Sequence, residues 1–370
     1  MKAAGMAAPV LPERIVHAML GELRVPRFAD VARAAEAIAP HVLRTPLLRS
    51  PVLDERAGGP VWLKAENLQV TGSFKIRGAF NALLALPPGR RAAGVVAYST
   101  GNHGQAIAWA ARRLGVPATI VMPVDAPKNK VARALAQGAR VVHYDRARES
   151  REDIGMRLLA ETGGTLVPPG DHPEVLAAQG TVALEALQDL APEARARLGL
   201  FAAPCGGGGL MAGCSLALAA LAPQAERVAV EPAGFDDTVR SLASGQRETN
   251  APGATTLCDA LMAVTPAELP FAVNQPLLGR AVAVSDTEVA AAMRFALEEL
   301  RLVVEPGGSV ALAALLAGHL HLQGRSAVIV LSGGNVDLPV LQSVTASPRH
   351  EAAISGPQET VPPPSIPGKS

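Results

Sequence analysis

The chain has 370 residues and a mass of 38.0 kDa, which is long for one hydrophobic core and favours two domains. Its formal net charge is +1 and no basic stripe follows the chain, which excludes the electrostatic signature of a nucleic-acid-binding protein. Three cysteines without a CxxC pair argue against a disulfide framework, and no apolar run approaches the roughly 20 residues of a membrane span. We therefore expect a cytoplasmic protein with no nucleic-acid or membrane partner.

Short apolar runs alternate with helical patterns along most of the chain. The first helical pattern covers residues 28–43, and residues 61–64 form the first expected strand. Such alternation predicts right-handed βαβ units, and hence an α/β fold with open, twisted, mainly parallel sheets and helices on both faces. Further strands are expected at residues 94–99, 118–122, 141–144, 198–203, 228–231, 282–284 and 326–331, and helices at residues 79–86, 105–114, 128–137, 148–161, 174–190, 210–221, 286–300 and 310–316.

The periodic pattern weakens in two places. Between residues 233 and 276 turn residues replace it, and a gap of that length in a compact domain is more often a functional connection than filler. Beyond residue 342 the chain is polar and rich in proline, which predicts a disordered tail over residues 342–370.

The stretch from Thr71 to Ala79 places a lysine at the start of an expected helix. Lys75 lies between Phe74 and Ile76, an unusual setting for a solvated charge. Burial lowers a lysine pKa because it penalises the ammonium form, and a neutral amine can attack a carbonyl group to form a Schiff base. A surface lysine in the first turn of a helix is the alternative, and this stretch alone does not separate the two.

Four consecutive glycines, residues 206–209, lie between an expected strand and an expected helix. Their accessible N–H groups and the partial positive charge of a helix N-terminus suit a phosphate. No Lys-Ser/Thr pair follows them, so a nucleotide P-loop is excluded. A dinucleotide fingerprint is a rival interpretation, since Gly207-x-Gly209 precedes Ala212 and Glu231 ends the next strand about 20 residues on. A nicotinamide oxidoreductase and a purely structural turn therefore stay open.

Two more loops follow expected strands. Residues 99–104 offer hydroxyl groups, an amide and N–H groups, which suit a carboxylate or a phenolic oxygen. His103 lies at the start of a helix, where the partial positive charge disfavours an imidazolium, so hydrogen bonding is favoured over acid–base catalysis. Ser332 follows the last strand, at the edge where open α/β sheets bind ligands.

Carboxylates cluster at Glu231, Asp236 and Asp237, and hard divalent cations take such oxygen ligands. A solvated acidic turn explains the same spacing, and both interpretations stay open. The pair His319-x-His321 resembles a metal-binding motif but lies at the end of an expected helix, and we interpret it as surface.

Four segments, in this order, resemble one enzyme family: residues 73–79, 99–103, 206–210 and 332–335. With them the chain resembles, from about residue 30 to 340, the threonine/serine dehydratases (threonine ammonia-lyases) and serine racemases. These are fold type II pyridoxal-phosphate (PLP) enzymes, which are tryptophan synthase beta-like. The resemblance weakens the nicotinamide interpretation, because that interpretation assigns no role to Lys75 or Asn102.

The resemblance implies a role for each motif residue. Lys75, beside Phe74, would hold PLP as a Schiff base and act as the catalytic base. Asn102 would bond the ring oxygen of PLP, and Ser332 would face its pyridine nitrogen. The phosphate would be bound by Gly206, Gly207, Gly208, Gly209 and Leu210. The substrate carboxylate would be held by Ser99, Thr100, Asn102 and His103. A divalent cation, Mg or Ca, would be bound by Glu231, the Phe235 carbonyl and Asp237.

The resemblance also implies two domains with PLP in the cleft between them. Residues 1–93 and 169–341 would form the large PLP-binding domain, and residues 94–168 the small substrate-side domain. The implied reaction is α,β-elimination of water from a small β-hydroxy amino acid of the L-threonine or L-serine type, giving a 2-oxo acid and ammonia, in a homodimer. The alternatives on this fold are a lyase for a bulkier β-hydroxy amino acid and a serine racemase. Thr100 weakens the racemase interpretation, because racemases place a serine there.

Overall fold

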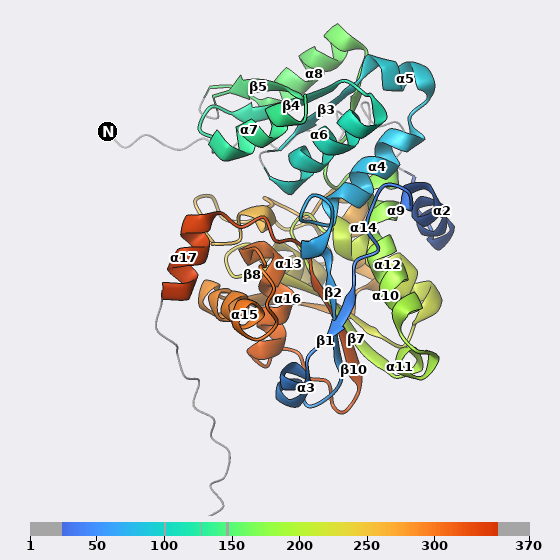
Figure 1. Cartoon of the computed structure of the whole chain (residues 1–370), viewed down its shortest axis with the longest axis vertical. Coiled ribbons are helices and arrows are strands. Elements are labelled where there is room, and N and C mark those ends of the chain that lie inside the picture. The colour runs from blue at the N-terminus through green and yellow to red at the C-terminus, as the bar shows by residue number, and fades with distance from the viewer. Residues whose placement is uncertain (1–23, 100, 127, 146–147, 347–370) are drawn as a thin grey trace, which may run out of the picture.

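The structure is a computed structural model, and it describes residues 24–99, 101–126, 128–145 and 148–346. Figure 1 shows two α/β layers, a smaller one at the top and a larger one below. Helices α4 (Lys75–Ala85) and α9 (Pro173–Gln179) lie where the two layers meet. In the part of the chain that the structure describes, no helix is long and apolar enough to cross a membrane.

The larger layer is built on a six-stranded sheet whose strands, in spatial order, are β1 (Leu47–Arg49), β2 (Val61–Ala65), β10 (Ser326–Leu331), β7 (Leu198–Pro204), β8 (Glu226–Pro232) and β9 (Arg280–Val284). The pair β1 and β2 is antiparallel, and the other neighbours are parallel. Strand β7 is buried along its whole length. Its continuous apolar sequence is therefore that of a central parallel strand with helices on both faces.

The smaller layer has a four-stranded sheet whose strands, in spatial order, are β5 (Arg140–Tyr144), β4 (Ala118–Pro123), β3 (Val95–Tyr98) and β6 (Thr165–Leu166). All neighbours in this sheet are parallel. The predicted α/β fold with two open, mainly parallel sheets is thus confirmed.

Helices cover both faces of each sheet, and the core between them is made of Ala, Leu and Val with few aromatic side chains. One face of the larger sheet packs against α3 (Pro51–Ala57), α15 (Asp286–Glu298) and α16 (Pro306–Leu316), and the other against α2 (Phe28–Ile38), α10 (Thr181–Asp189) and α12 (Gly209–Leu221). The smaller sheet packs against α4, α6 (Asn102–Leu114) and α7 (Lys128–Ala136) on one face and α8 (Arg151–Thr162) on the other. The remaining helices are η1 (Glu66–Leu68), α5 (Pro88–Ala93), α11 (Pro192–Ala196), α13 (Asp237–Ser244), η2 (Asp259–Leu261), α14 (Glu268–Leu277) and α17 (Leu338–Ala346).

Three expectations about element bounds need correction. The helix predicted at residues 28–43 ends at Ile38. The helix predicted at residues 174–190 divides at Gly180, where a Cβ would lie 2.5 Å from the Gly213 carbonyl oxygen, so α9 and α12 approach too closely for a side chain. The disorder predicted from residue 342 is wrong for residues 342–346, because α17 continues to Ala346 and packs Val344 into the core. Residues 347–370 lie outside the described residues.

The predicted domain boundaries stay a prediction. The strands of the smaller sheet fall between residues 95 and 166, inside the predicted range of 94–168. However, the core on one face of that sheet also takes side chains from α2, α4 and α9, which lie outside this range.

The sheet topology brings distant loops to one edge. Strands β2, β10 and β7 are parallel neighbours, so the segments after their carboxyl ends meet. These segments carry Lys75, Ser332 and the four glycines. Open parallel sheets bind ligands at this edge.

Candidate active site

Lys75 is the first residue of α4, and its side chain is partly buried. Its Nζ donates to the Pro169 carbonyl oxygen at 3.3 Å and lies 5.0 Å from the centre of the Phe74 ring. Burial lowers the pKa of Lys75 to about 8. A substantial fraction of the amine is therefore neutral near physiological pH, as attack on a carbonyl group requires.

The four glycines form the turn from β7 into α12. Gly208 has φ +90, and a Cβ there would lie 3.0 Å from Nδ2 of Asn274, so the turn depends on glycine. In the described residues no side chain caps α12, and the first N–H groups of this 13-residue helix are left for a ligand. A Cβ on Gly209 would lie 3.6 Å from the Pro169 oxygen that Lys75 contacts, so the glycine loop and Lys75 meet at Pro169.

The segment after β10 is joined to the segment before Lys75. Ser73 and Gly333 form an antiparallel bridge, and the Phe74 N–H donates to the Ser332 carbonyl oxygen at 3.2 Å. Ser332 is buried. The structure therefore places Ser332 beside Phe74 and next to the lysine, as its predicted position in the site requires.

Asn102, the first residue of α6, extends from the smaller layer to the larger one. Its Nδ2 donates to Oε1 of Glu305 at 2.6 Å, and its Oδ1 accepts from Nδ2 of Asn335 at 2.8 Å. The same Nδ2 of Asn335 donates to the Thr71 carbonyl oxygen at 2.8 Å, just before the lysine segment. These bonds join the Asn102 loop to the Lys75 and Ser332 segments.

His103 is buried and not free to carry a charge. Its Nε2 lies 2.7 Å from the Val167 carbonyl oxygen, so this nitrogen holds the proton of the neutral ring. Burial, and then the charge of Lys75, lower the pKa of His103 to about 3. The preference for hydrogen bonding over acid–base work agrees with this geometry, but the ring bonds a protein carbonyl and offers no cation to a carboxylate.

Other groups at the start of α6 suit a substrate carboxylate better than the His103 ring. In the described residues no side chain caps α6, and the N–H groups of its first turn have no partner within the helix. The Ser99 hydroxyl accepts from the Gly101 N–H at 3.1 Å and so shapes the turn. Thr100, the other predicted substrate residue, lies outside the described residues.

Glu231 and Asp237 are fully buried close together at the end of β8. The two oxygens of Glu231 accept from the N–H groups of Thr238 at 3.0 Å and Val239 at 2.9 Å. Burial, and then repulsion by Asp237, raise the pKa of Glu231 to about 8, and burial raises the pKa of Asp237 to about 6. Oδ2 of Asp237 has no partner among the described residues. An uncompensated buried pair with a free oxygen suits a divalent cation.

The metal role of Glu231, Asp237 and the Phe235 carbonyl stays a prediction. Phe235 is buried in the turn between β8 and α13, close to both carboxylates in the chain. The same burial argues against the nicotinamide interpretation, since a fully buried Glu231 is out of reach of a ribose.

Sequence reasoning missed residues that complete this site. Glu305 contacts Asn102 but precedes a Pro-Gly-Gly start of a helix, which by itself reads as a plain N-terminus. The sequence predicts only a turn at Pro169, and it shows Arg77 only as one residue of the lysine motif. Each of these groups contacts a residue that is distant in the sequence, and such a partner cannot be identified from local sequence patterns.

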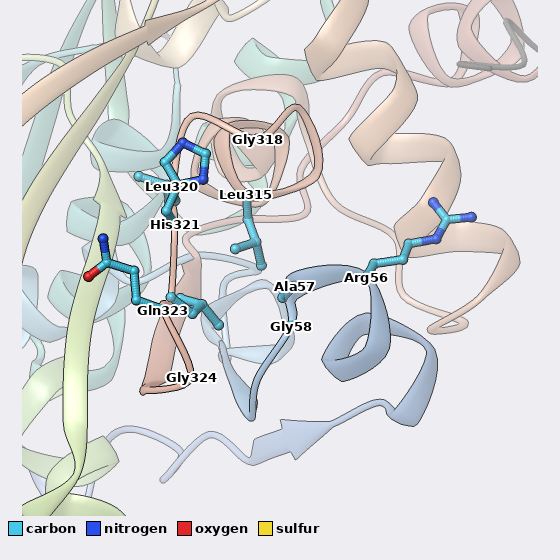
Figure 2. A pocket seen from close by; sticks show the side chains of 10 residues that line it. Arg56, Ala57, Gly58, Leu315, Gly318, Leu320, His321, Gln323 and Gly324 are labelled. Atoms are coloured by element: carbon cyan, nitrogen blue, oxygen red, sulfur yellow. The ribbon is translucent and has the colours of Figure 1, made fainter. Parts of the chain in front are cut away.

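A surface hollow of about 500 Å³ lies elsewhere, between the end of α3 and the turns around α16 and β10. Figure 2 shows Arg56, Leu315, His321 and Gln323 around it. Its lining includes His321 of the His319-x-His321 pair but no residue of the four segments that carry the family resemblance, so it has no part in the site described above. His319 nearby pairs with Glu288 at 2.8 Å, in agreement with a surface role for this histidine.

Comparison with known proteins identifies the family. A family described as pyridoxal-phosphate dependent enzyme matches residues 38–333, well over half of the chain. The chain belongs to this family. The predicted resemblance and the PLP cofactor are thereby confirmed, and the nicotinamide interpretation is set aside.

The site fits this cofactor. The glycine turn leaves N–H groups free at the start of α12 for the phosphate, and the amine of Lys75, with its lowered pKa, suits the aldehyde. The Asn102 amide and Ser332 lie on the neighbouring segments. The individual roles of these residues stay predictions.

Relatives within the family include ammonia-lyases and racemases. The L-threo-3-hydroxyaspartate ammonia-lyase of Saccharomyces cerevisiae is 42% identical over 85% of this chain and 94% of its own. The L-threonine ammonia-lyase of Thermotoga maritima is 38% identical over 85% of this chain and 77% of its own. The solved serine racemase of Dictyostelium discoideum superposes with a TM-score of 0.80 at 34% identity, over 85% of this chain and all of that chain.

Proposed function

We propose that this enzyme is a PLP-dependent ammonia-lyase that eliminates water from a small β-hydroxy amino acid and releases a 2-oxo acid and ammonia. The observation that carries the proposal is the position of the Lys75 amine, which contacts the Pro169 carbonyl oxygen at 3.3 Å beside the glycine turn and whose pKa burial lowers to about 8. The ammonia-lyases at 42% and 38% identity support this reaction class.

Lys75 would have two tasks at its Nζ. Its neutral amine would hold the cofactor through the aldehyde, and the free amine would accept the α-proton of the substrate. When bound, PLP withdraws electrons from the substrate and so makes this α-proton acidic. The Phe74 ring and the Pro169 carbonyl hold the amine close to the position it must reach again at the end of each turnover.

Ser332 and the glycines would set the cofactor in place. The N–H groups of Gly206, Gly207, Gly208, Gly209 and Leu210 bind the phosphate without a cationic side chain. The Ser332 hydroxyl would face the ring nitrogen and, unlike a carboxylic acid, would not protonate it. A weaker electron sink favours rapid loss of the β-hydroxyl over transfer of the amino group.

The start of α6 would hold the substrate carboxylate. The N–H groups of its first turn would supply donors, Ser99 and Thr100 would supply hydroxyls, and Asn102 would bond the cofactor. His103 fixes this turn through its bond to the Val167 carbonyl, so we assign it a positioning role within the predicted substrate group.

Three further features complete the proposal. Glu231, Asp237 and the Phe235 carbonyl would hold a divalent cation, Mg or Ca, which the unpartnered Oδ2 of Asp237 supports. A homodimer follows from the family resemblance. A cytoplasmic location is supported by three buried cysteines that form no disulfide.

The substrate class extends beyond threonine and serine. The relative at 42% identity acts on L-threo-3-hydroxyaspartate, a β-hydroxy amino acid with a bulkier side chain. We therefore propose a panel of L-serine, L-threonine and L-threo-3-hydroxyaspartate as candidate substrates. Serine racemase is the alternative activity, in agreement with the solved racemase at 34% identity.

One experiment tests the reaction. The wild type, Lys75→Ala and the control Lys128→Ala, an exposed lysine on α7, are reconstituted with PLP and assayed for ammonia, 2-oxo acid and D-amino acid. We expect equal yields of ammonia and 2-oxo acid from one panel member, no activity in Lys75→Ala, and full activity in Lys128→Ala. D-Serine formed without a matching yield of 2-oxo acid would instead show a racemase.

A further inference from the structure

The Asn102 amide is held at both ends by residues from the larger layer. Glu305 accepts from its Nδ2 at 2.6 Å, and Asn335 donates to its Oδ1 at 2.8 Å. An amide whose oxygen faces a donor and whose nitrogen faces an acceptor cannot flip, exchanging the two atoms, without losing both hydrogen bonds. Nδ2 carries a second hydrogen, for which the described residues offer no acceptor. The orientation of Asn102 therefore leaves one N–H for a ligand.

The Glu305 side chain bonds Asn102 and does not cap its own helix. Glu305 is the N-cap residue of α16, yet its side chain makes no capping bond. Its backbone N–H donates to the Gly333 carbonyl oxygen at 3.0 Å, and a Cβ on Gly333 would collide with Oε1 of Glu305. The glycine after Ser332 thus makes room for the Glu305 carboxyl group beside Asn102.

Burying this carboxyl group is costly, because no lysine or arginine of the described chain pairs with it. Glu305 is 5% exposed. The charges that face it are Lys130 from α7 and Asp259 from η2, and its other donors are the Asn102 amide and the Asn335 N–H. Burial is the largest effect on the carboxyl group and raises the pKa of Glu305 to about 7. A buried carboxyl group without an ion pair lowers the stability of the fold, so we infer that Glu305 has a function at the site.

We propose that Glu305 is a positioning residue for the cofactor: it holds the Asn102 amide so that the free N–H meets the ring oxygen of PLP. The inference rests on the proposed role of Asn102 in the lyase site. Glu305 touches neither substrate nor cofactor in this scheme and acts through Asn102. Its carboxylate holds the amide firmly in one orientation, because a hydrogen bond to an ionised acceptor is stronger than one to a neutral acceptor.

The proposal predicts a dependence on pH. Below about pH 7 Glu305 is protonated and its bond to Asn102 weakens, and above it the carboxylate holds the amide firmly. The visible absorption of the Lys75-bound cofactor reports the electronic state of the ring oxygen. We therefore expect this absorption to change with pH around 7, and the change to depend on the charge of residue 305.

The test compares Glu305→Gln, Glu305→Ala and the control Glu299→Gln, an exposed carboxylate at the end of α15. Each holoenzyme is scanned for visible absorption from pH 5.5 to 9, and PLP dissociation constants are measured by titration of the apoprotein at pH 8. We expect the step near pH 7 in the wild type and in Glu299→Gln. Glu305→Gln should lose the step but bind PLP about as tightly, since its amide oxygen still accepts. Glu305→Ala should bind PLP roughly tenfold more weakly.

Two results would overturn the proposal: an unchanged pH step in Glu305→Gln, or wild-type PLP affinity in a folded Glu305→Ala. If Glu305→Ala does not fold, the pH profile of Glu305→Gln decides alone. A failure of the proposed lyase function looks different. In that case the wild type turns over no amino acid of the panel, whereas the spectroscopic step and its loss in Glu305→Gln remain and support the role of Glu305.

Discussion

Arg77 and Glu66 form a fully buried ion pair directly behind the lysine site. Nε and Nη2 of Arg77 donate to the two Glu66 oxygens, each at 2.8 Å, and neither side chain is exposed. On its other side Arg77 donates to both oxygens of Glu185, at 2.7 and 2.8 Å. Lys64 completes the network with a bond to Glu185 at 2.6 Å. The network holds the first turn of α4, and hence Lys75, on the larger layer.

Removing Arg77 should strongly destabilise the fold. In Arg77→Met the carboxylates of Glu66 and Glu185 keep only Lys64 as a cation, and a buried charge without its partner costs about 3–5 kcal/mol. Urea unfolding of the apoprotein measures the loss. The control Arg157→Met removes an exposed partner of Glu161 on α8 and should change stability by less than about 0.5 kcal/mol. Equal effects of the two variants would contradict a structural role for the network.

Lys75 should make the stability of the apoprotein depend on pH in a defined window. Its pKa in the fold is about 8, below the 10.5 of an unfolded chain, so the unfolded state binds more protons between these values. Stability therefore rises with pH from about 8 to about 10.5, by at most roughly 1.4 kcal/mol per pH unit. The measurement is the difference between urea unfolding curves of the wild type and Lys75→Ala, which cancels the titration of other groups. A difference that stays flat across this window would show that the amine is solvated in the fold.

A substitution at Gly207 tests whether the glycine turn binds a phosphate or is only a structural turn. A Cβ on Gly207 would have only Ala267 near it, at 3.8 Å, and its φ is not in the left-handed region. Gly207→Ala should therefore unfold like the wild type but bind PLP about tenfold more weakly, because a methyl group intrudes where the phosphate approaches the backbone. The control Gly89→Ala lies in open space on α5 and should change neither property. Wild-type PLP affinity in Gly207→Ala would favour a turn without a ligand.

The acidic pair should respond to divalent cations. Binding of Mg²⁺ or Ca²⁺ between Glu231 and Asp237 would relieve their repulsion and raise the melting temperature of the protein, by roughly 5 °C at a hundredfold excess over Kd. Asp237→Asn should abolish this rise. Asp236→Asn, which alters a half-exposed neighbour paired with Arg240, should keep it. A melting temperature that neither cation nor chelator changes would contradict the metal prediction.

Those features of the site that depend only on neighbouring residues in one short segment could be predicted from the sequence. Consecutive glycines between a strand and a helix, and a lysine beside apolar residues after a strand, carry their chemistry locally. The glycine turn from β7 into α12 agrees with the structure, and the partial burial of Lys75 favours the Schiff-base interpretation that its neighbours had left open. The strand–helix alternation likewise predicted the two parallel sheets, since a buried parallel strand must be apolar on both faces.

Contacts between distant residues could not be predicted in this way. Lys75 and Pro169 are 94 positions apart, Asn102 and Glu305 203, and Asn102 and Asn335 233. Their meeting depends on how the two layers pack, which no local pattern encodes. The structure likewise decided that the His103 ring is neutral and bonded to Val167, because burial and not spacing sets its pKa.

The sequence by itself thus determined the fold class, because apolar alternation acts over a few residues, and it indicated the family and its chemistry through the resemblance of four short segments. The tertiary structure alone decided which polar groups from the two layers face one another. It brought Glu305 into hydrogen-bond contact with Asn102. It also placed both oxygens of Glu231 where they accept hydrogen bonds from N–H groups of α13. Burial in a packed interior changes the proton affinity of such groups, and burial exists only once the chain has folded.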